Sequence, residues 1–140
     1  MKIMVAPSIL SADFANLADE IASVSSADWL HIDVMDGVFV PNISIGIPVV
    51  ASIRKATSMF LDVHLMITRP ERYVAEFCRA GADLVVFHVE AAQPQDIFEA
   101  ISIVKAEGKR VGLSVKPKTP ASALAPYLGM LDVVLGMTVE

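Results

Sequence analysis

The segment His31-Ile32-Asp33-Val34-Met35 decides the fold, because branched aliphatic residues alternate in it with residues of other types. Successive side chains of a β-strand point to opposite faces. Ile32 and Val34 therefore share one face, and His31, Asp33 and Met35 share the other. The same aliphatic face recurs in later segments as Val63 and Leu65, as Val85, Phe87 and Val89, and as Val111, Leu113 and Val115. Each segment is predicted to pack its aliphatic face against helices and to carry its polar groups on the opposite face.

Six β-branched runs recur along the chain, and their first residues lie 23 to 32 positions apart. Residues at helical spacing lie between them, for example Phe14, Leu17, Ile21 and Val24. This alternation predicts parallel strands joined by right-handed crossovers. The six predicted strands are Ile3–Leu10, Trp29–Met35, Leu61–Ile67, Leu84–Glu90, Arg110–Lys116 and Val133–Val139.

Proline and glycine mark the ends of the predicted helices. Thr68 is suited to cap a helix with Pro70 in its first turn and Gly81 as its stop. The remaining marks are Pro94 and Gly108, which bracket a second helix, and Thr119-Pro120, which opens a third.

An open doubly wound sheet and a closed barrel both satisfy this alternation. No Gly-x-Gly-x-x-Gly pattern follows the first predicted strand, which argues against the open sheet. Polar residues gather on one face at the carboxyl ends of the strands, where barrel enzymes place their active sites. We therefore predict an incomplete (β/α)₈ TIM barrel, with about six of eight strand–helix units, as a single domain over residues 1–140.

The composition narrows the classes of partner. The chain has 11 basic and 16 acidic residues and a net charge of −5, without a basic stripe, so no nucleic-acid partner is expected. No apolar run approaches the ~20 residues of a spanning helix, so no membrane partner is expected. Cys78 is the only cysteine and is read as a small apolar helix residue. A reducing cytoplasm is the predicted location.

His31, Asp33 and His64 are the candidate metal ligands. His31 and Asp33 point the same way from one strand, and His64 ends the facing strand at a matching depth. Two imidazoles and a carboxylate suit a divalent transition metal. The same pattern also fits a buried pair of histidines hydrogen-bonded to an aspartate, and spacing alone leaves both readings open.

Other strand-end residues have two readings each. Met35, Met66 and Met137 are flexible core filling or contacts to a ligand. Ser8 is a structural hydroxyl or a ligand contact, and Asp36-Gly37 is most simply a turn. The remaining candidates are His88 and Glu90, as direct site residues or as a pair that supports the site or is structural, and Lys116, as a phosphate partner or a solvated lysine.

The longer motifs of the chain are Pro7–Phe14, His31–Gly37 with Phe39–Asn42, Asp62–Met66, Phe87–Glu90, Gly112–Pro117 and Met137–Glu140. They resemble the ribulose-phosphate 3-epimerase family, and the similarity covers essentially the whole chain. The resemblance implies a metal-assisted isomerase with a TIM barrel that inverts carbon 3 of a ketopentose phosphate, in carbohydrate metabolism by the pentose phosphate pathway. The alternatives are an epimerase of the same group acting on allulose 6-phosphate, or a non-catalytic fragment that binds a metal or a partner.

The resemblance also implies roles for individual residues. Asp33 matches a catalytic base that is also a metal ligand, and His31 and His64 match the other ligands of one divalent ion (Zn, Fe, Mn or Co). The implied substrate is a small sugar phosphate, and the complete protein is expected to be a homo-oligomer. The substrate-binding positions are Ser8, His64, Met35, Met66 and Met137.

Members of the family continue past the position of Glu140. The resemblance places their second catalytic aspartate, a fourth metal ligand and the phosphate-binding amides in that continuation. The chain is therefore expected to be truncated at its C-terminus relative to the family. Residues 1–140 alone are expected to be inactive.

Overall fold

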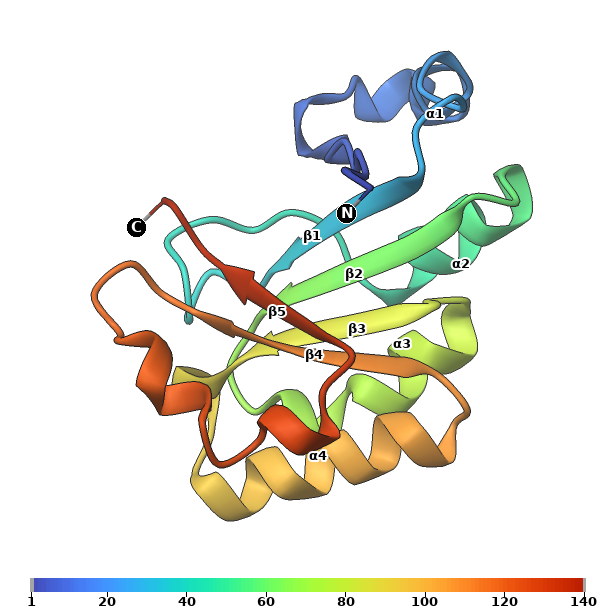
Figure 1. Cartoon of the computed structure of the whole chain (residues 1–140). Helices are drawn as coiled ribbons and strands as arrows, with labels where there is room; N and C mark the ends of the chain where they lie inside the picture. Colours follow the sequence, from blue (N-terminus) through green and yellow to red (C-terminus); the bar gives the residue numbers. More distant parts are fainter. Residues whose placement is uncertain (1, 140) are drawn as a thin grey trace.

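The computed structural model describes residues 2–139, in which five parallel strands pair in chain order, β1 to β5 (Figure 1). A doubly wound sheet would reverse its strand order at a switch point, and this sheet does not. The prediction of an incomplete (β/α)₈ barrel is confirmed. The strands are β1 (Trp29–Met35), β2 (Phe60–Met66), β3 (Leu84–His88), β4 (Arg110–Val115) and β5 (Val133–Gly136), and the α-helices are α1 (Leu17–Ser23), α2 (Ile47–Ala56), α3 (Val74–Ala80) and α4 (Pro94–Ala106).

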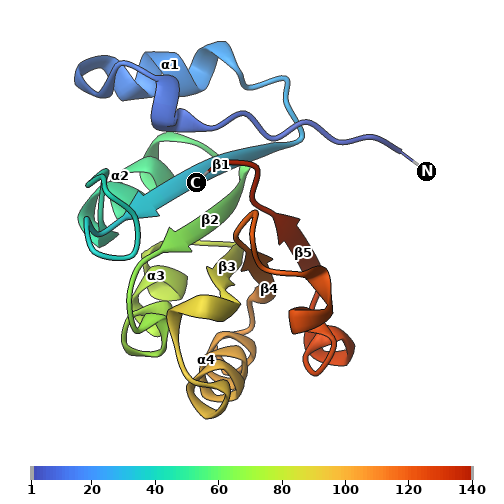
Figure 2. The same cartoon turned by 90° about the vertical axis from the view of Figure 1, so that its left-hand side faces the viewer.

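The strands follow an arc, and α2, α3 and α4 lie outside it (Figure 2). The register aligns Val34 with Leu65, Leu65 with Phe87, and Phe87 with Leu113. These four side chains are at most 4% exposed and belong to the main hydrophobic core. The predicted aliphatic face is therefore the outer face, which packs against the helices. The residues that alternate with these along each strand lie on the inner face.

The helix ends follow the predicted glycine and proline marks in two cases. Helix α3 ends at Gly81, whose φ of 121° a side chain would not tolerate. Helix α4 begins at Pro94, and Gly108 follows it with a φ of 73°. Helix α2 has no counterpart among the predicted helices. Short 3₁₀ turns complete the fold at Ile9–Ser11, Phe14–Asn16, Pro70–Arg72, Val89–Ala91, Ala121–Leu124 and Leu128–Met130.

The predicted first strand, Ile3–Leu10, is not a regular strand. The chain there runs beside β1, and the Val5 and Pro7 carbonyls accept hydrogen bonds from the backbone N–H groups of Trp29 and His31. The backbone pairing within residues 2–139 is limited to these bonds, a bond from the Asp28 N–H to the Val5 carbonyl, and a single bridge between Ser8 and His31. Pro7 has no N–H to return a ladder bond, and the chain then turns into a 3₁₀ turn at Ile9. The six predicted strands are therefore corrected to five within residues 2–139.

Two predicted helix starts are also corrected. Thr68 does not cap a helix, because its N–H and hydroxyl both donate to Asp36 Oδ2 instead. The other Asp36 oxygen accepts the N–H groups of Val38 and Phe39, as expected for a turn. Asp36 thus ties the loop after β1 to the loop after β2. Thr119-Pro120 opens only the 3₁₀ turn Ala121–Leu124.

None of the helices formed by residues 2–139 has both the length and the apolar character needed to cross a membrane.

Candidate active site

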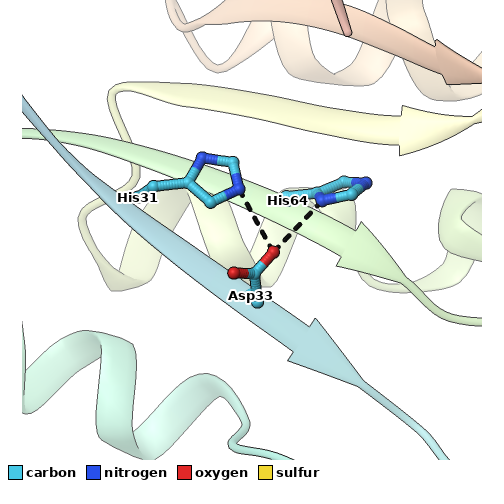
Figure 3. Close-up of side chains that lie close together, drawn as sticks. All are labelled: His31, Asp33 and His64. Carbon is cyan, nitrogen blue, oxygen red and sulfur yellow. Dashed lines mark hydrogen bonds and ion pairs between the residues drawn. The ribbon is translucent and has the colours of Figure 1, made fainter. Parts of the chain in front are cut away.

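His31, Asp33 and His64 converge on the inner face of the sheet, as predicted (Figure 3). His31 and Asp33 come from β1, and His64 is the register partner of Asp33 on β2. Asp33 Oδ1 lies 3.1 Å from His31 Nε2 and 3.3 Å from His64 Nδ1. One carboxylate oxygen is therefore shared between two imidazole rings.

The geometry of these three groups fits a metal ion. One candidate ligand atom from each residue lies within 4.8 Å of the other two. An ion with bonds of ~2.1 Å separates neighbouring nitrogen and oxygen ligands by roughly 3.0–3.4 Å. The two measured separations around Asp33 Oδ1 fall in that range. Two nitrogens and one oxygen form a donor set for a divalent transition metal.

His31 is held from behind by a second carboxylate. Asp62, on β2, is 8% exposed, and its Oδ2 lies 2.7 Å from His31 Nδ1. Burial opposes a charge on the His31 ring, but hydrogen bonds to Asp33 and Asp62 outweigh it and raise the His31 pKa to about 10. Asp62 is a site residue that the sequence pattern did not single out. Its position on the inner face, as the register partner of His31, is the signal that identifies it.

His64 is held from behind by a second histidine. His64 Nε2 lies 2.8 Å from His88 Nε2, and His88 Nδ1 lies 3.2 Å from Glu90 Oε2. His88 is fully buried, and this burial, together with the nearby His64 ring, lowers its pKa to about 4. The His88 ring is therefore neutral at neutral pH. Neither His88 nor Glu90 lines the pocket beside Asp33, and both reach the site through His64, so the structure favours a supporting pair over residues that contact a ligand directly.

Asp33 is kept ionised by its neighbours. Burial opposes its charge, but hydrogen bonds from His31, His64 and Ser8 hold the pKa of Asp33 well below its usual range. The Ser8 hydroxyl donates to Asp33 Oδ2. An ionised carboxylate in a pocket can accept a proton from a bound molecule.

A pocket of about 380 Å³ opens beside Asp33. All three predicted methionines border it, and Asp33 is the only carboxylate among its lining residues within 2–139. Lys116 is not among them, because its Nζ donates to the Phe39 carbonyl and lies 3.9 Å from the centre of the Phe39 ring. The lining residues are Leu10, His31, Asp33, Met35, Val40, Pro41, Asn42, His64, Met66, Leu135, Gly136, Met137, Thr138 and Val139.

Comparison with known proteins identifies the family. Residues 4–140 match the model of the ribulose-phosphate 3 epimerase family. The chain belongs to this family. It is 51% identical over 98% of its length to ribulose-phosphate 3-epimerase of Mycobacterium bovis, of which it covers 59%. It is 48% identical over 99% of its length to the Bacillus subtilis ribulose-phosphate 3-epimerase, of which it covers 64%.

The chain thus spans about three fifths of the length of these curated relatives. A solved structure of 3-keto-L-gulonate-6-phosphate decarboxylase from Vibrio cholerae superposes with a TM-score of 0.72, over 93% of this chain and 59% of that one. Its sequence identity is 13%, so this likeness concerns the fold alone. Homo-oligomer formation and the absence of nucleic-acid and membrane partners stay predictions.

Proposed function

We propose that this chain forms the proton-abstracting part of a ribulose-phosphate 3-epimerase, which interconverts D-ribulose 5-phosphate and D-xylulose 5-phosphate. The observation that carries the proposal is the ionised Asp33 carboxylate, which borders the pocket between two histidines. Inversion at carbon 3 begins with removal of the proton next to the ketone. Asp33 is the group in the pocket that can take it, and the Ser8 hydroxyl orients its second oxygen.

His31, Asp33 and His64 would hold one divalent ion, with Zn, Fe, Mn and Co as candidates by their donor types. Such an ion, when bound, supplies positive charge that stabilises negative charge developing on the oxygens of the substrate. The chain itself supplies the geometry. Asp62 orients the His31 ring, so that Nε2 points toward Asp33.

Met35, Met66 and Met137 would cover the reacting carbons. They come from the ends of β1 and β2 and from the segment after β5, and all three border the pocket. Thioether side chains exclude water and bring no charge that competes with Asp33. A drier pocket strengthens each electrostatic interaction inside it.

The reaction needs a second acid. A single base returns the proton to the face from which it was taken, and that leaves the stereochemistry unchanged. Asp33 is the only carboxylate lining the pocket within residues 2–139. We therefore expect residues 1–140 by themselves to bind a metal ion without epimerising ribulose 5-phosphate.

A chimera tests the proposal. Residues 1–140 replace the matching part of the Bacillus subtilis enzyme, which is 48% identical to them. Both the chimera and the 140-residue chain are titrated with Zn²⁺ and assayed with ribulose 5-phosphate, with allulose 6-phosphate as a competing substrate. We expect both proteins to bind the ion, and only the chimera to convert the pentose phosphate. A folded, metal-loaded chimera that prefers allulose 6-phosphate, or that converts neither sugar, would contradict the proposal.

A further inference from the structure

An unusual chain of hydrogen bonds leads away from the pocket. Three short contacts join Asp33 to His64, His64 to His88, and His88 to Glu90, at 3.3, 2.8 and 3.2 Å. Each contact needs one hydrogen between its two heavy atoms. Two neutral imidazole rings carry only two hydrogens on nitrogen. The chain therefore lacks one hydrogen, or it holds one additional positive charge.

The two ends of this series of hydrogen bonds determine where the additional positive charge lies. Glu90 Oε1 accepts a hydrogen bond of 2.6 Å from the backbone N–H of Lys116, and the Glu90 carboxylate also accepts one from the Thr119 side chain. This end is therefore well supplied with donors. At the other end, Asp33 Oδ1 is also contacted by a second imidazole, the ring of His31. A cation bound by Asp33 and His64 would fill the one contact that has no hydrogen. His64 would then donate to His88, and His88 would donate to Glu90.

We propose that His88 and Glu90 are positioning residues, which fix the hydrogen of His64 on Nε2 and so direct a bare Nδ1 lone pair toward the metal ion. This inference rests on the metal site of the proposed function. Neither residue lines the pocket, so both act through His64. A histidine ligand is tuned in this way when its second nitrogen donates to a fixed acceptor.

The surroundings leave His64 no substitute acceptor. His64 is 3% exposed and His88 is fully buried, and their rings stack with centroids 4.9 Å apart. The centre of the Phe39 ring lies 4.9 Å from that of the His88 ring, and Lys116 Nζ lies over the Phe39 ring. Solvent therefore has little access to the contact between the two histidines. An unpaired N–H at this depth is costly, so His88 has to serve as the acceptor.

Glu90 has to accept on both oxygens. Oε1 receives the Lys116 N–H, and Oε2 receives His88 Nδ1. In Glu90→Gln one of these oxygens becomes an NH₂ group, which faces either the Lys116 N–H or His88 Nδ1. In the first arrangement the NH₂ group faces another donor, the Lys116 N–H. The second arrangement reverses the positions of the hydrogens along the histidine pair. Because two facing donors repel, the second arrangement is favoured, and it places the hydrogen of His64 on Nδ1, where the lone pair would face the ion.

Metal affinity of the 140-residue chain is the primary test, measured by chelator competition with Zn²⁺ and Co²⁺. We expect His88→Phe and Glu90→Gln to bind about 10–100-fold more weakly than the wild type, as for other residues that support metal ligands. His88→Gln can offer a carbonyl oxygen to His64 and should recover part of the loss. Glu99→Gln, an exposed substitution of the same type on α4, should bind like the wild type.

A ¹⁵N spectrum of labelled histidines separates positioning from a merely structural role. In the Zn²⁺-bound wild type, His64 Nε2 should carry a hydrogen and His88 Nε2 should not. Glu90→Gln should change this pattern while circular dichroism shows a folded protein. Wild-type affinity in both His88→Phe and Glu90→Gln would overturn the inference and leave the metal site standing. A wild-type chain that binds neither ion would overturn the metal site itself.

Discussion

The two faces of the same strands solve opposite problems. On β2, Leu65 points outward and His64 points inward, and both are almost completely buried, at 0% and 3% exposed. Leu65 needs only close packing, because apolar atoms gain by leaving water. His64 needs a partner for each nitrogen, because a buried polar group without one is costly. Burial alone therefore does not distinguish core residues from site residues. The presence of hydrogen-bond partners distinguishes them.

The inner face meets this need by linking polar residues through neighbouring strands. Asp62 supports His31, and the pair His88–Glu90 supports His64, so that both supports end at Asp33. Three buried side-chain atoms within residues 2–139 lack a hydrogen-bond partner, and two of them, Asp62 Oδ1 and Ser114 Oγ, lie on this inner face, while the third is Glu71 Oε2. The outer face has no comparable network, because its residues are aliphatic or aromatic. Substitutions on the two faces should therefore be separable by what they change.

Asp33→Asn is expected to have the largest effect, a loss of function with the fold retained. The amide keeps the size of the side chain, but it cannot take up the substrate proton and is a poorer metal ligand. General-base catalysis is typically worth ~10²–10⁴-fold, and the weaker metal site adds to the loss. In the chimera, kcat/KM for ribulose 5-phosphate should fall by at least that factor, while circular dichroism shows that the substituted protein still folds. Near-normal turnover with full metal content would place the base elsewhere.

The outer face was the part of the fold most open to prediction from sequence. Strand alternation depends on local geometry, so the positions of Leu65 and Phe87 follow from a period of two residues. The segment Ile3–Leu10 was predicted wrongly because its composition suits a strand, whereas Pro7 removes a donor that pairing requires. Helix α2 was missed because Pro48 stands in its first turn but no glycine marks its end. Gly46 precedes it and Thr57 follows it.

The site was predictable in its centre and not in its support. His31, Asp33 and His64 share a face and a depth, and these follow from the strand pattern. The roles of Asp62 and His88 depend on the register between strands and on ring orientation, which no local pattern specifies. Lys116 was placed correctly on its strand end, yet its side chain folds onto Phe39, some 77 residues away along the chain. Long-range contacts of this kind decide which polar residue reaches a pocket.

Leu65→Ala is expected to have the second largest effect, and to act on stability alone. Leu65 is fully buried in the core between the sheet and the helices. Truncation of a buried leucine leaves a cavity and lowers the free energy of unfolding by about 2–5 kcal/mol. Chemical denaturation of the 140-residue chain measures this change. Leu128→Ala, at a position that is 54% exposed, is the matched control and should stay within about 0.5 kcal/mol. Should Leu65→Ala weaken Zn²⁺ binding in the folded protein, the two faces would not be independent.

Cys78 gives the smallest and most direct test of the contrast between the faces. Cys78 lies on α3 in the outer core and is 2% exposed. Its burial, with the nearby Glu107 carboxylate, raises the thiol pKa to about 11, whereas hydrogen bonds hold the pKa of Asp33 low on the inner face. The outer layer thus keeps an ionisable group neutral, and the inner face keeps one charged. Because the thiol pKa rises from 9.0 to about 11, the reactive thiolate at pH 8 should be roughly a hundredfold scarcer than for an exposed thiol. Alkylation of the folded chain should therefore be slow at pH 8 and should still accelerate above pH 9, while the chain unfolded in guanidinium reacts at the rate of a free thiol. Equal rates in the folded and unfolded chains at pH 8 would show that the outer layer is open to solvent, and the contrast between the faces would then fail.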